Sequence, residues 1–309
     1  MDFLIFVISI AILISGADML IRSSNALALK LNISHFLMGA FLVAIGTSLP
    51  EMGVAIEANS SAKSEMAIAL IIGSSILNMT LIFGAIFLFS KSVSIKKYFF
   101  KKDTLWLLVS LALFMLVLMD QKLGYFDAFI LLAVVGSYLL FLIEDAEKAR
   151  GEFTKEILNN TLHLPYALGM LLFGGVFLIV GSIFVVDSVG AIASKLQLDE
   201  WSSGIILIAF AAALPELILT VLAVYKEKIE IAIVNIIGST ISNLTLVVGV
   251  VIFVNPIEIN LSIHLFDLAT MLVASLSLIA IILTKSYNRY SSFLLLLILI
   301  LFIHQTLFA

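Results

Sequence analysis

Long apolar stretches alternate with short polar connections along the whole chain of 309 residues. An α-helix needs about 20 mainly apolar residues to cross roughly 30 Å of hydrocarbon, and several of these stretches are long enough. The pattern therefore predicts an all-α membrane protein with ten transmembrane helices. The expected spans cover residues 2–21, 34–57, 65–90, 103–119, 125–144, 163–187, 201–225, 229–254, 264–284 and 291–308.

The composition agrees with a lipid environment. Hydrophobic residues make up 62% of the chain and charged residues 12%, against about 25% charged in a typical soluble domain. The chain has no cysteine, which excludes disulfides and thiolate metal sites. A net charge of −4 gives no reason to expect a nucleic-acid partner. The first apolar run lacks a basic leader and a small-residue cleavage site, so we expect it to be retained as a span.

The basic residues predict the orientation in the membrane. Of the 17 Lys and Arg residues, all but Lys63, Lys122 and Lys195 lie in connections that follow odd-numbered spans. Because cytoplasmic loops are enriched in Lys and Arg, those connections are expected on the cytoplasmic side and both termini outside it. The longest polar connection, 145–162, becomes a cytoplasmic loop between residues 1–144 and 163–309. Each half has five spans, an odd number, so the halves are expected to be inverted relative to each other.

Two sequence segments each occur twice along the chain. In both cases the second copy follows the first by 165 residues, a spacing that we call the repeat offset. FLVAIGTSLPE at 41–51 corresponds to ILIAFAAALPE at 206–216, and IGSSILNMTL at 72–81 corresponds to IGSTISNLTL at 237–246. Secondary transporters often consist of inverted repeats, with discontinuous helices forming an ion site near the membrane midplane. The duplication therefore predicts an ion site between the two halves.

A proline followed by a glutamate lies deep in one span of each half. Pro50 and Pro215 lack an amide donor, so we expect them to break their helices and free carbonyl groups that a cation can use. Glu51 and Glu216 follow directly, and a charged acid at the centre of a span costs about 2.5–3.5 kcal/mol. No Lys or Arg lies deep enough to compensate them. Two such carboxylates suit one divalent cation, and oxygen ligands favour a hard ion such as calcium.

Hydroxyl and amide side chains near these acids supply further candidate ligands. Thr47 and Ser48 precede Glu51 by about one helical turn. Two Ser–Asn pairs have a spacing of four residues, so each pair shares one helix face, and Gly73 and Gly238 permit close approach of their helices. The complete set of side-chain candidates is Glu51, Glu216, Thr47, Ser48, Ser74, Asn78, Ser239 and Asn243.

These motifs resemble the calcium:cation antiporter superfamily, and most closely its prokaryotic sodium/calcium exchangers. That family has ten spans in two inverted repeats, a G-T-S-L-P-E signature and a following G-S-x-x-x-N or G-S-x-x-x-D segment. The resemblance implies calcium and sodium as transported ions, Glu51 and Glu216 as paired calcium ligands, and the carbonyls of Ala44 and Ala209 facing sodium. It further implies a plasma-membrane antiporter (the prokaryotic inner membrane), surrounded by lipid, that is not an enzyme and needs neither a cofactor nor an obligate protein partner.

The second half departs from the family pattern at one place. Ala211–Ala213 stands where the family repeats G-T-S, so two hydroxyls are missing, although the Ala212 carbonyl could still coordinate an ion. Asn243 stands where family members often have Asp. Proton-coupled exchange of calcium or another divalent cation, and a degenerate family member that only binds cations, therefore remain alternatives. A membrane hydrolase with an acid–base dyad is a third, but it leaves the hydroxyl and amide residues unexplained.

The first and sixth spans are the expected moving elements. Gly16 and Gly181 occupy equivalent positions in the two halves. On this interpretation the two glycines allow these spans to pack closely against the core and to slide along it.

Overall fold

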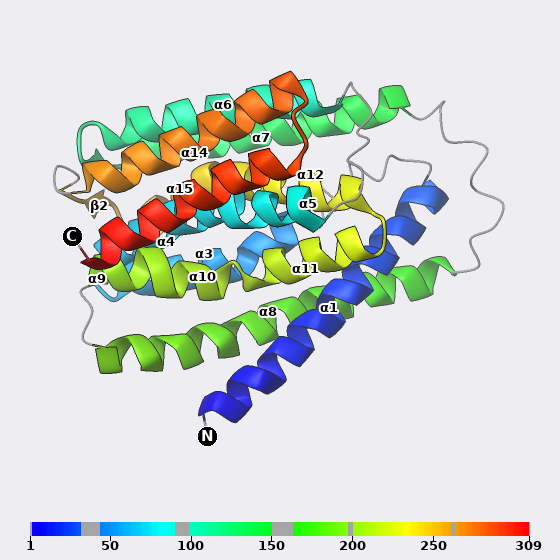
Figure 1. Ribbon diagram of the computed structural model, residues 1–309, viewed down its shortest axis with the longest axis horizontal. Helices are drawn as coiled ribbons and strands as arrows, with labels where there is room; N and C mark the ends of the chain where they lie inside the picture. The colour runs from blue at the N-terminus through cyan, green and yellow to red at the C-terminus, as the bar shows by residue number, and fades with distance from the viewer. Residues whose placement is uncertain are drawn as a thin grey trace.

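The computed structural model describes residues 2–31, 44–89, 99–149, 163–196, 200–260 and 264–308, and these are almost entirely helical (Figure 1). The first half contains α1 (Asp2–Leu31), α3 (Ala44–Ser60), α4 (Ser64–Leu77), η2 (Asn78–Ile82), α5 (Phe83–Phe89), α6 (Phe99–Leu118) and α7 (Tyr125–Ala149). The second half contains α8 (Leu164–Leu196), α9 (Glu200–Ser202), η4 (Ser203–Ile208), α10 (Ala209–Ala212), α11 (Leu214–Tyr225), α12 (Ile229–Ser242), η5 (Asn243–Val247), α13 (Val248–Val254), α14 (Leu265–Thr284) and α15 (Arg289–Phe308). Two short strands, β1 (Lys122–Leu123) and β2 (Ile257–Glu258), pair antiparallel.

The bounds of the helices around the repeated motifs recur at the repeat offset. α4, η2 and α5 span 64–77, 78–82 and 83–89, and α12, η5 and α13 span 229–242, 243–247 and 248–254. α3 likewise corresponds to α10 and α11 together. The sequence repeat is therefore also a repeat of local structure, including a π-helical segment that begins at an asparagine in each half.

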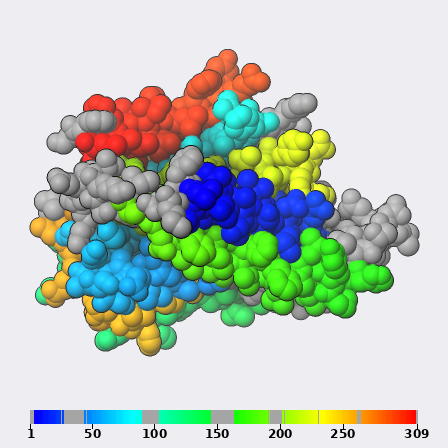
Figure 2. Space-filling view, turned by 90° about the horizontal axis from the view of Figure 1, so that it is seen from below, coloured from blue at the N-terminus to red at the C-terminus, as the bar shows by residue number. Residues whose placement is uncertain are grey.

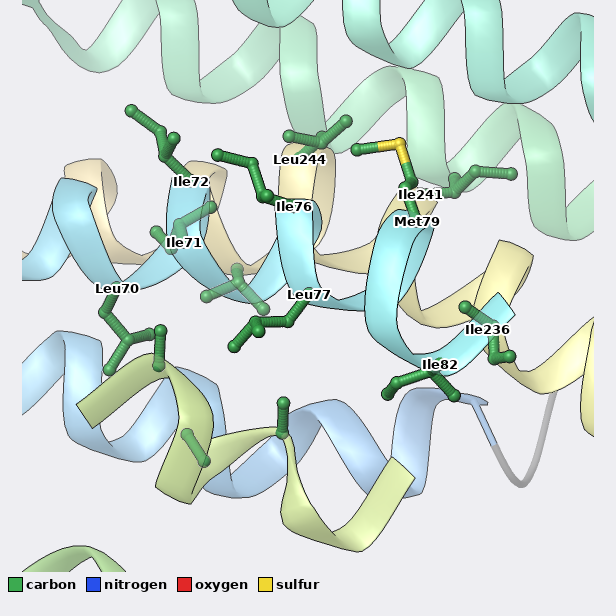
Figure 3. Packing of buried hydrophobic residues seen from close by; sticks show 14 of the residues in the cluster. Leu70, Ile71, Ile72, Ile76, Leu77, Met79, Ile82, Ile236, Ile241 and Leu244 are labelled. Carbon is green, nitrogen blue, oxygen red and sulfur yellow. The ribbon is translucent and has the colours of Figure 1, made fainter. Parts of the chain in front are cut away.

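Two central helical runs are enclosed by the others. In the most apolar stretches of Ser64–Phe89 and Ile231–Val254, 89% and 83% of the residues are buried, against 33% in Leu4–Ser24 and 28% in Tyr125–Glu144. A helix that is apolar on all sides is expected in such a central position. Figure 3 shows isoleucine and leucine side chains of α4 filling the space around it, with Met79 and Leu244 nearby. The core of the protein is thus built around the two segments that carry the Ser–Asn pairs.

The membrane spans agree with the expectation only in part. Among the described residues, seven helices are long and apolar enough to cross a membrane, or eight if Gly204–Ala212 (η4 with α10) and α11 form one bent span. Of the other two expected spans, 34–57 begins in residues outside the described part, and 103–119 corresponds to a shorter apolar helix, Asp103–Leu118. The chain is a multi-pass membrane protein, while the count of ten remains a prediction.

The two deep prolines behave differently. Pro215 lies at the start of α11, which meets the preceding helical segment at 47° across Ala213. Pro50, in contrast, lies inside the continuous helix α3, so the expected break at Pro50 is wrong for the described residues. A proline inside a membrane helix is tolerated where neighbouring helices and side chains satisfy the freed backbone groups, and α3 packs against α4 and α12. In the turn before Pro50 the hydroxyls of Thr47 and Ser48 both bond the Ala44 carbonyl, at 3.1 and 3.0 Å. The alanines that replace them in the second half have no such hydroxyls.

α1 and α8 pack on each other along their length, as Figure 2 shows on the face turned to the viewer. A Cβ at Gly16 would lie 2.9 Å from the Gly174 carbonyl oxygen of α8, and one at Gly181 would lie 2.9 Å from Leu13 of α1. These glycines therefore join α1 to α8, and the expectation that they pack against the core is wrong. An ion pair between Asp18 and Lys226 links α1 to the end of α11.

Candidate cation-binding site

All of the residues predicted for the ion site are buried in the structure. None is more than 1% exposed, and they lie on α3, on α4 with η2, on α10 with α11, and on α12 with η5. The set comprises Ala44, Thr47, Ser48, Glu51, Ser74, Asn78, Ala209, Ala212, Glu216, Ser239 and Asn243. Polar contacts link most of these side chains across the two halves.

Glu51 is held by one residue from its own half and one from the other. Ser74 Oγ donates a hydrogen bond to Glu51 Oε1. Asn243 Nδ2 donates to Ser74 Oγ at 3.0 Å and also interacts with the Glu51 carboxylate. The asparagine of the second half therefore completes the surroundings of the acid of the first half.

Glu216 has the corresponding arrangement. Ser239 Oγ donates to Glu216 Oε1 at 3.1 Å, and the Thr47 hydroxyl also interacts with this carboxylate. Ser48 Oγ lies 3.1 Å from Ser239 Oγ, so a second hydroxyl of α3 joins the same network. Each carboxylate is thus bonded by the serine 23 residues after it and approached by a residue of the opposite half.

Several oxygens in this cluster have no hydrogen-bond partner within the described part of the chain. They are Glu51 Oε2, Glu216 Oε2, Asn78 Oδ1 and Asn243 Oδ1. A buried polar atom without a partner is costly, so such atoms in a native structure call for a ligand or water. Carboxylate and amide oxygens are the ligands that calcium takes, with six to eight oxygens at about 2.3–2.6 Å. The cluster therefore has the chemistry of a hard-cation site.

The backbone around the site explains how these groups are positioned. η2 and η5 begin at Asn78 and Asn243, and π-helical turns of this kind are frequent at functional sites. A Cβ at Gly73 would lie 2.0 Å from the carbonyl oxygen of Ile205, so only glycine allows α4 to approach η4 this closely. Glu216 lies in the first turn of α11, where the helix dipole stabilises a negative charge, whereas Glu51 lies in the interior of α3.

The alanine positions contribute only backbone groups. The Ala44 carbonyl accepts the hydroxyls of Thr47 and Ser48, and the Ala209 carbonyl accepts the Ala213 amide at 2.9 Å. Next to the break, the Glu216 amide lies against its own carboxylate. Ala212 is the last residue of α10, directly before the break at Ala213, so its carbonyl is at a helix end.

One buried polar residue beside the site was not predicted from the sequence. Asn235 of α12 is fully buried, and its Oδ1 lies 3.4 Å from Thr47 Oγ1. Asn235 is not part of the duplicated pattern, because the equivalent residue in the first half is Leu70. Asn235 precedes Ser239 by four residues and therefore lies on the helix face that carries Ser239 and Asn243. This spacing could have identified it from the sequence.

Nearly continuous apolar helices around a buried, oxygen-rich cluster define a multi-pass membrane protein with a candidate cation site. Within the described residues no group of three or more His, Cys, Asp or Glu could hold a metal, so the site depends on two carboxylates and neutral oxygens. The family described as "Sodium/calcium exchanger protein" matches residues 1–144 and 166–308, and the chain belongs to this family.

Curated relatives and solved structures agree with this assignment. The chain is 29% identical to the inner membrane protein YrbG of Escherichia coli over 279 residues, covering 88% of this chain and 86% of the relative. It is 27% identical to the sodium/calcium exchanger MaX1 of Methanosarcina acetivorans over 321 residues, covering 92% and 91%. A structure of the sodium-calcium exchanger NCX_Mj soaked with Na⁺ and Sr²⁺ matches with a TM-score of 0.80 and 25% identity, covering 97% of this chain and 98% of that one. The protein is therefore a membrane protein of the calcium:cation antiporter superfamily.

Proposed function

We propose that this protein exchanges calcium for sodium across the plasma membrane by alternating access, with Glu51 and Glu216 as central ligands. The observation that carries the proposal is the set of buried carboxylate and amide oxygens that have no partner among the described residues. Thr47, Ser48 and the two Ser–Asn pairs supply the remaining side-chain oxygens, and the carbonyls of Ala44, Ala209 and Ala212 are backbone candidates.

The charge of the site supports exchange between a divalent and a monovalent cation. Two buried carboxylates carry a joint charge of −2 that one calcium ion neutralises. Sodium ions can replace it at the same oxygens, so binding of one ion excludes the other. If more monovalent charge enters than calcium charge leaves, the membrane potential drives export with about 2.3 kcal/mol per charge per 100 mV.

The architecture that we propose is a pair of inverted five-helix repeats, residues 1–144 and 163–309, joined by the cytoplasmic connection 145–162. The recurrence of helix bounds at the repeat offset supports the repeats, and the distribution of basic residues supports termini outside the cytoplasm. In this arrangement α1 and α8 move together as one unit against the remaining helices. Their glycine-mediated contact supports such a unit.

The relatives support calcium and sodium as the transported ions. MaX1 is named a sodium/calcium exchanger, and NCX_Mj is a sodium-calcium exchanger whose structure was obtained with Na⁺ and Sr²⁺. Strontium is a divalent cation of the same chemical group as calcium. Both names therefore favour a site that accepts a divalent cation and sodium in turn.

A second candidate is proton-coupled exchange of calcium or another divalent cation. Ala212 and Ala213 favour it, because two hydroxyls that would line a sodium position are replaced by methyl groups. Glu51 and Glu216 could then carry the counter-transported protons.

Calcium-45 uptake into proteoliposomes tests these functions. Vesicles loaded with sodium are diluted into sodium, potassium or choline medium, with and without a pH step. Sodium exchange predicts uptake that requires the outward sodium gradient and is independent of the pH step. Uptake driven only by protons would assign the coupling to the second candidate. Calcium binding without uptake under any gradient would contradict both and identify a cation-binding family member without transport.

A further inference from the structure

Asn235 has unused hydrogen-bonding capacity beside the candidate site. The residue is 0% exposed, and its Nδ2 has no partner within the described ranges. Its Oδ1 lies 3.4 Å from Thr47 Oγ1. The Nδ2 group is a donor and cannot bind a cation, so the group that a cation can use is Oδ1, whose contact among the described residues is this long one to Thr47.

The Thr47 hydroxyl cannot satisfy all the acceptors that surround it. Its oxygen lies 3.1 Å from the Ala44 carbonyl oxygen and 3.4 Å from Asn235 Oδ1, and it also faces the Glu216 carboxylate. A hydroxyl has one proton and two lone pairs, so donation to Ala44 leaves Asn235 Oδ1 without a donor. Two oxygens that bind one calcium ion at about 2.3–2.6 Å and at right angles lie about 3.3–3.7 Å apart, and a sodium ion has nearly the same radius as a calcium ion. The observed separation fits two ligands of one ion.

In the other half, the residues equivalent to Thr47 and Asn235 are both apolar. The repeat offset relates Thr47 to Ala212 and Leu70 to Asn235. α10 packs on α4 as α3 packs on α12, and both Ala212 and Leu70 are fully buried. In Figure 3, Leu70 points from α4 toward the yellow-green ribbon of the broken helix. The hydroxyl and the amide are therefore lost together.

We propose that Asn235 Oδ1 is a further ligand of the monovalent-cation position at Thr47 Oγ1 and the Glu216 carboxylate, and that the equivalent position at Ala212 and Leu70 takes no ion. This inference rests on the proposed exchange of calcium for sodium. One carboxylate gives the position a charge of −1, which suits a single monovalent cation. Asn235 thus determines how well sodium competes with calcium.

The test measures displacement of calcium-45 by sodium from the detergent-purified protein, with choline chloride holding the ionic strength constant. Asn235→Leu copies Leu70 and is expected to raise the ratio of the sodium to the calcium half-saturation concentration at least about tenfold. Asn235→Asp keeps an oxygen at the position and adds charge, so it is expected to lower this ratio and serves if the leucine variant does not fold. The double variant Ala212→Thr, Leu70→Asn is expected to make displacement steeper in sodium concentration.

The outcomes separate this inference from the proposed function. If sodium does not displace calcium from the unmodified protein, the proposed function fails before any variant is compared. If sodium displaces calcium from the unmodified protein and both Asn235 variants keep the same ratio, only the assignment of Asn235 is overturned. A leucine variant whose ratio changes, with an aspartate variant shifted in the opposite direction, supports it.

Discussion

Replacement of Glu51 by glutamine is expected to weaken calcium binding strongly without changing the shape of the site. The side chain is 1% exposed, and glutamine keeps an oxygen that can accept the hydrogen bond from Ser74. The change removes one of the two carboxylate charges of the proposed cation site. Loss of one partner from a buried charge pair costs about 3–5 kcal/mol, which corresponds to a loss of affinity of about 10²- to 10³-fold or more.

Equilibrium binding of calcium-45 to the detergent-purified protein measures this effect. Glu57→Gln is the matched control, because Glu57 lies on the same helix α3 but is exposed, with only a local contact from Ser61. The control is expected to bind calcium like the unmodified protein. The reasoning is refuted if Glu51→Gln stays within about threefold of the unmodified affinity, a difference below about 1 kcal/mol. It is equally refuted if both variants lose affinity to the same extent.

Three further changes test the packing around the site. Asn59→Leu removes three hydrogen bonds, two to the carbonyls of Val251 and Asn255 at 3.0 and 2.7 Å and one from the Ser64 hydroxyl at 2.8 Å. A loss of about 2–3 kcal/mol is expected as a lower unfolding temperature, and an unchanged temperature would contradict this. Gly73→Val places a side chain against the backbone of η4 and is expected to abolish calcium binding, whereas Gly136→Val, at a position with open space, is not. The double variant Gly16→Leu, Gly181→Leu is expected to separate α1 from α8 and stop calcium uptake, and normal uptake would argue against α1 and α8 as the moving unit.

The sequence predicts the membership of the candidate site because each half carries the same motif. Glu51 and Glu216 are buried, and the Ser–Asn pairs lie beside them, as the fixed offset and the four-residue spacing require. Their identity as ion ligands remains a prediction. The family assignment that the motifs implied is confirmed by the match over both halves.

Contacts between the two halves could not be predicted from the sequence. Periodicity places a residue on a helix face but does not say which helix that face meets. Asn243 reaches Glu51 and Thr47 reaches Glu216, and only the three-dimensional packing decides this crossing. The π-helical turns at the asparagines are also invisible to a pattern of apolar positions.

The behaviour of the prolines shows how neighbouring residues modify a local rule. The loss of an amide donor is the same at Pro50 and Pro215, yet only the second helix bends by 47° at a break. The two prolines differ in their neighbours, since Thr47 and Ser48 precede Pro50 whereas Ala212 and Ala213 precede Pro215. Proline alone therefore did not determine where the helix would break.

The recurrence of helix bounds in the two halves has a consequence for how such a site can evolve. If the two halves were separate copies of one short chain, a single mutation would alter both sides of the site at once. Covalent fusion removes this constraint, because each half then has its own codons. Asn235 can face Thr47 on one side while Leu70 and Ala212 occupy the other, a difference that no assembly of identical subunits could encode.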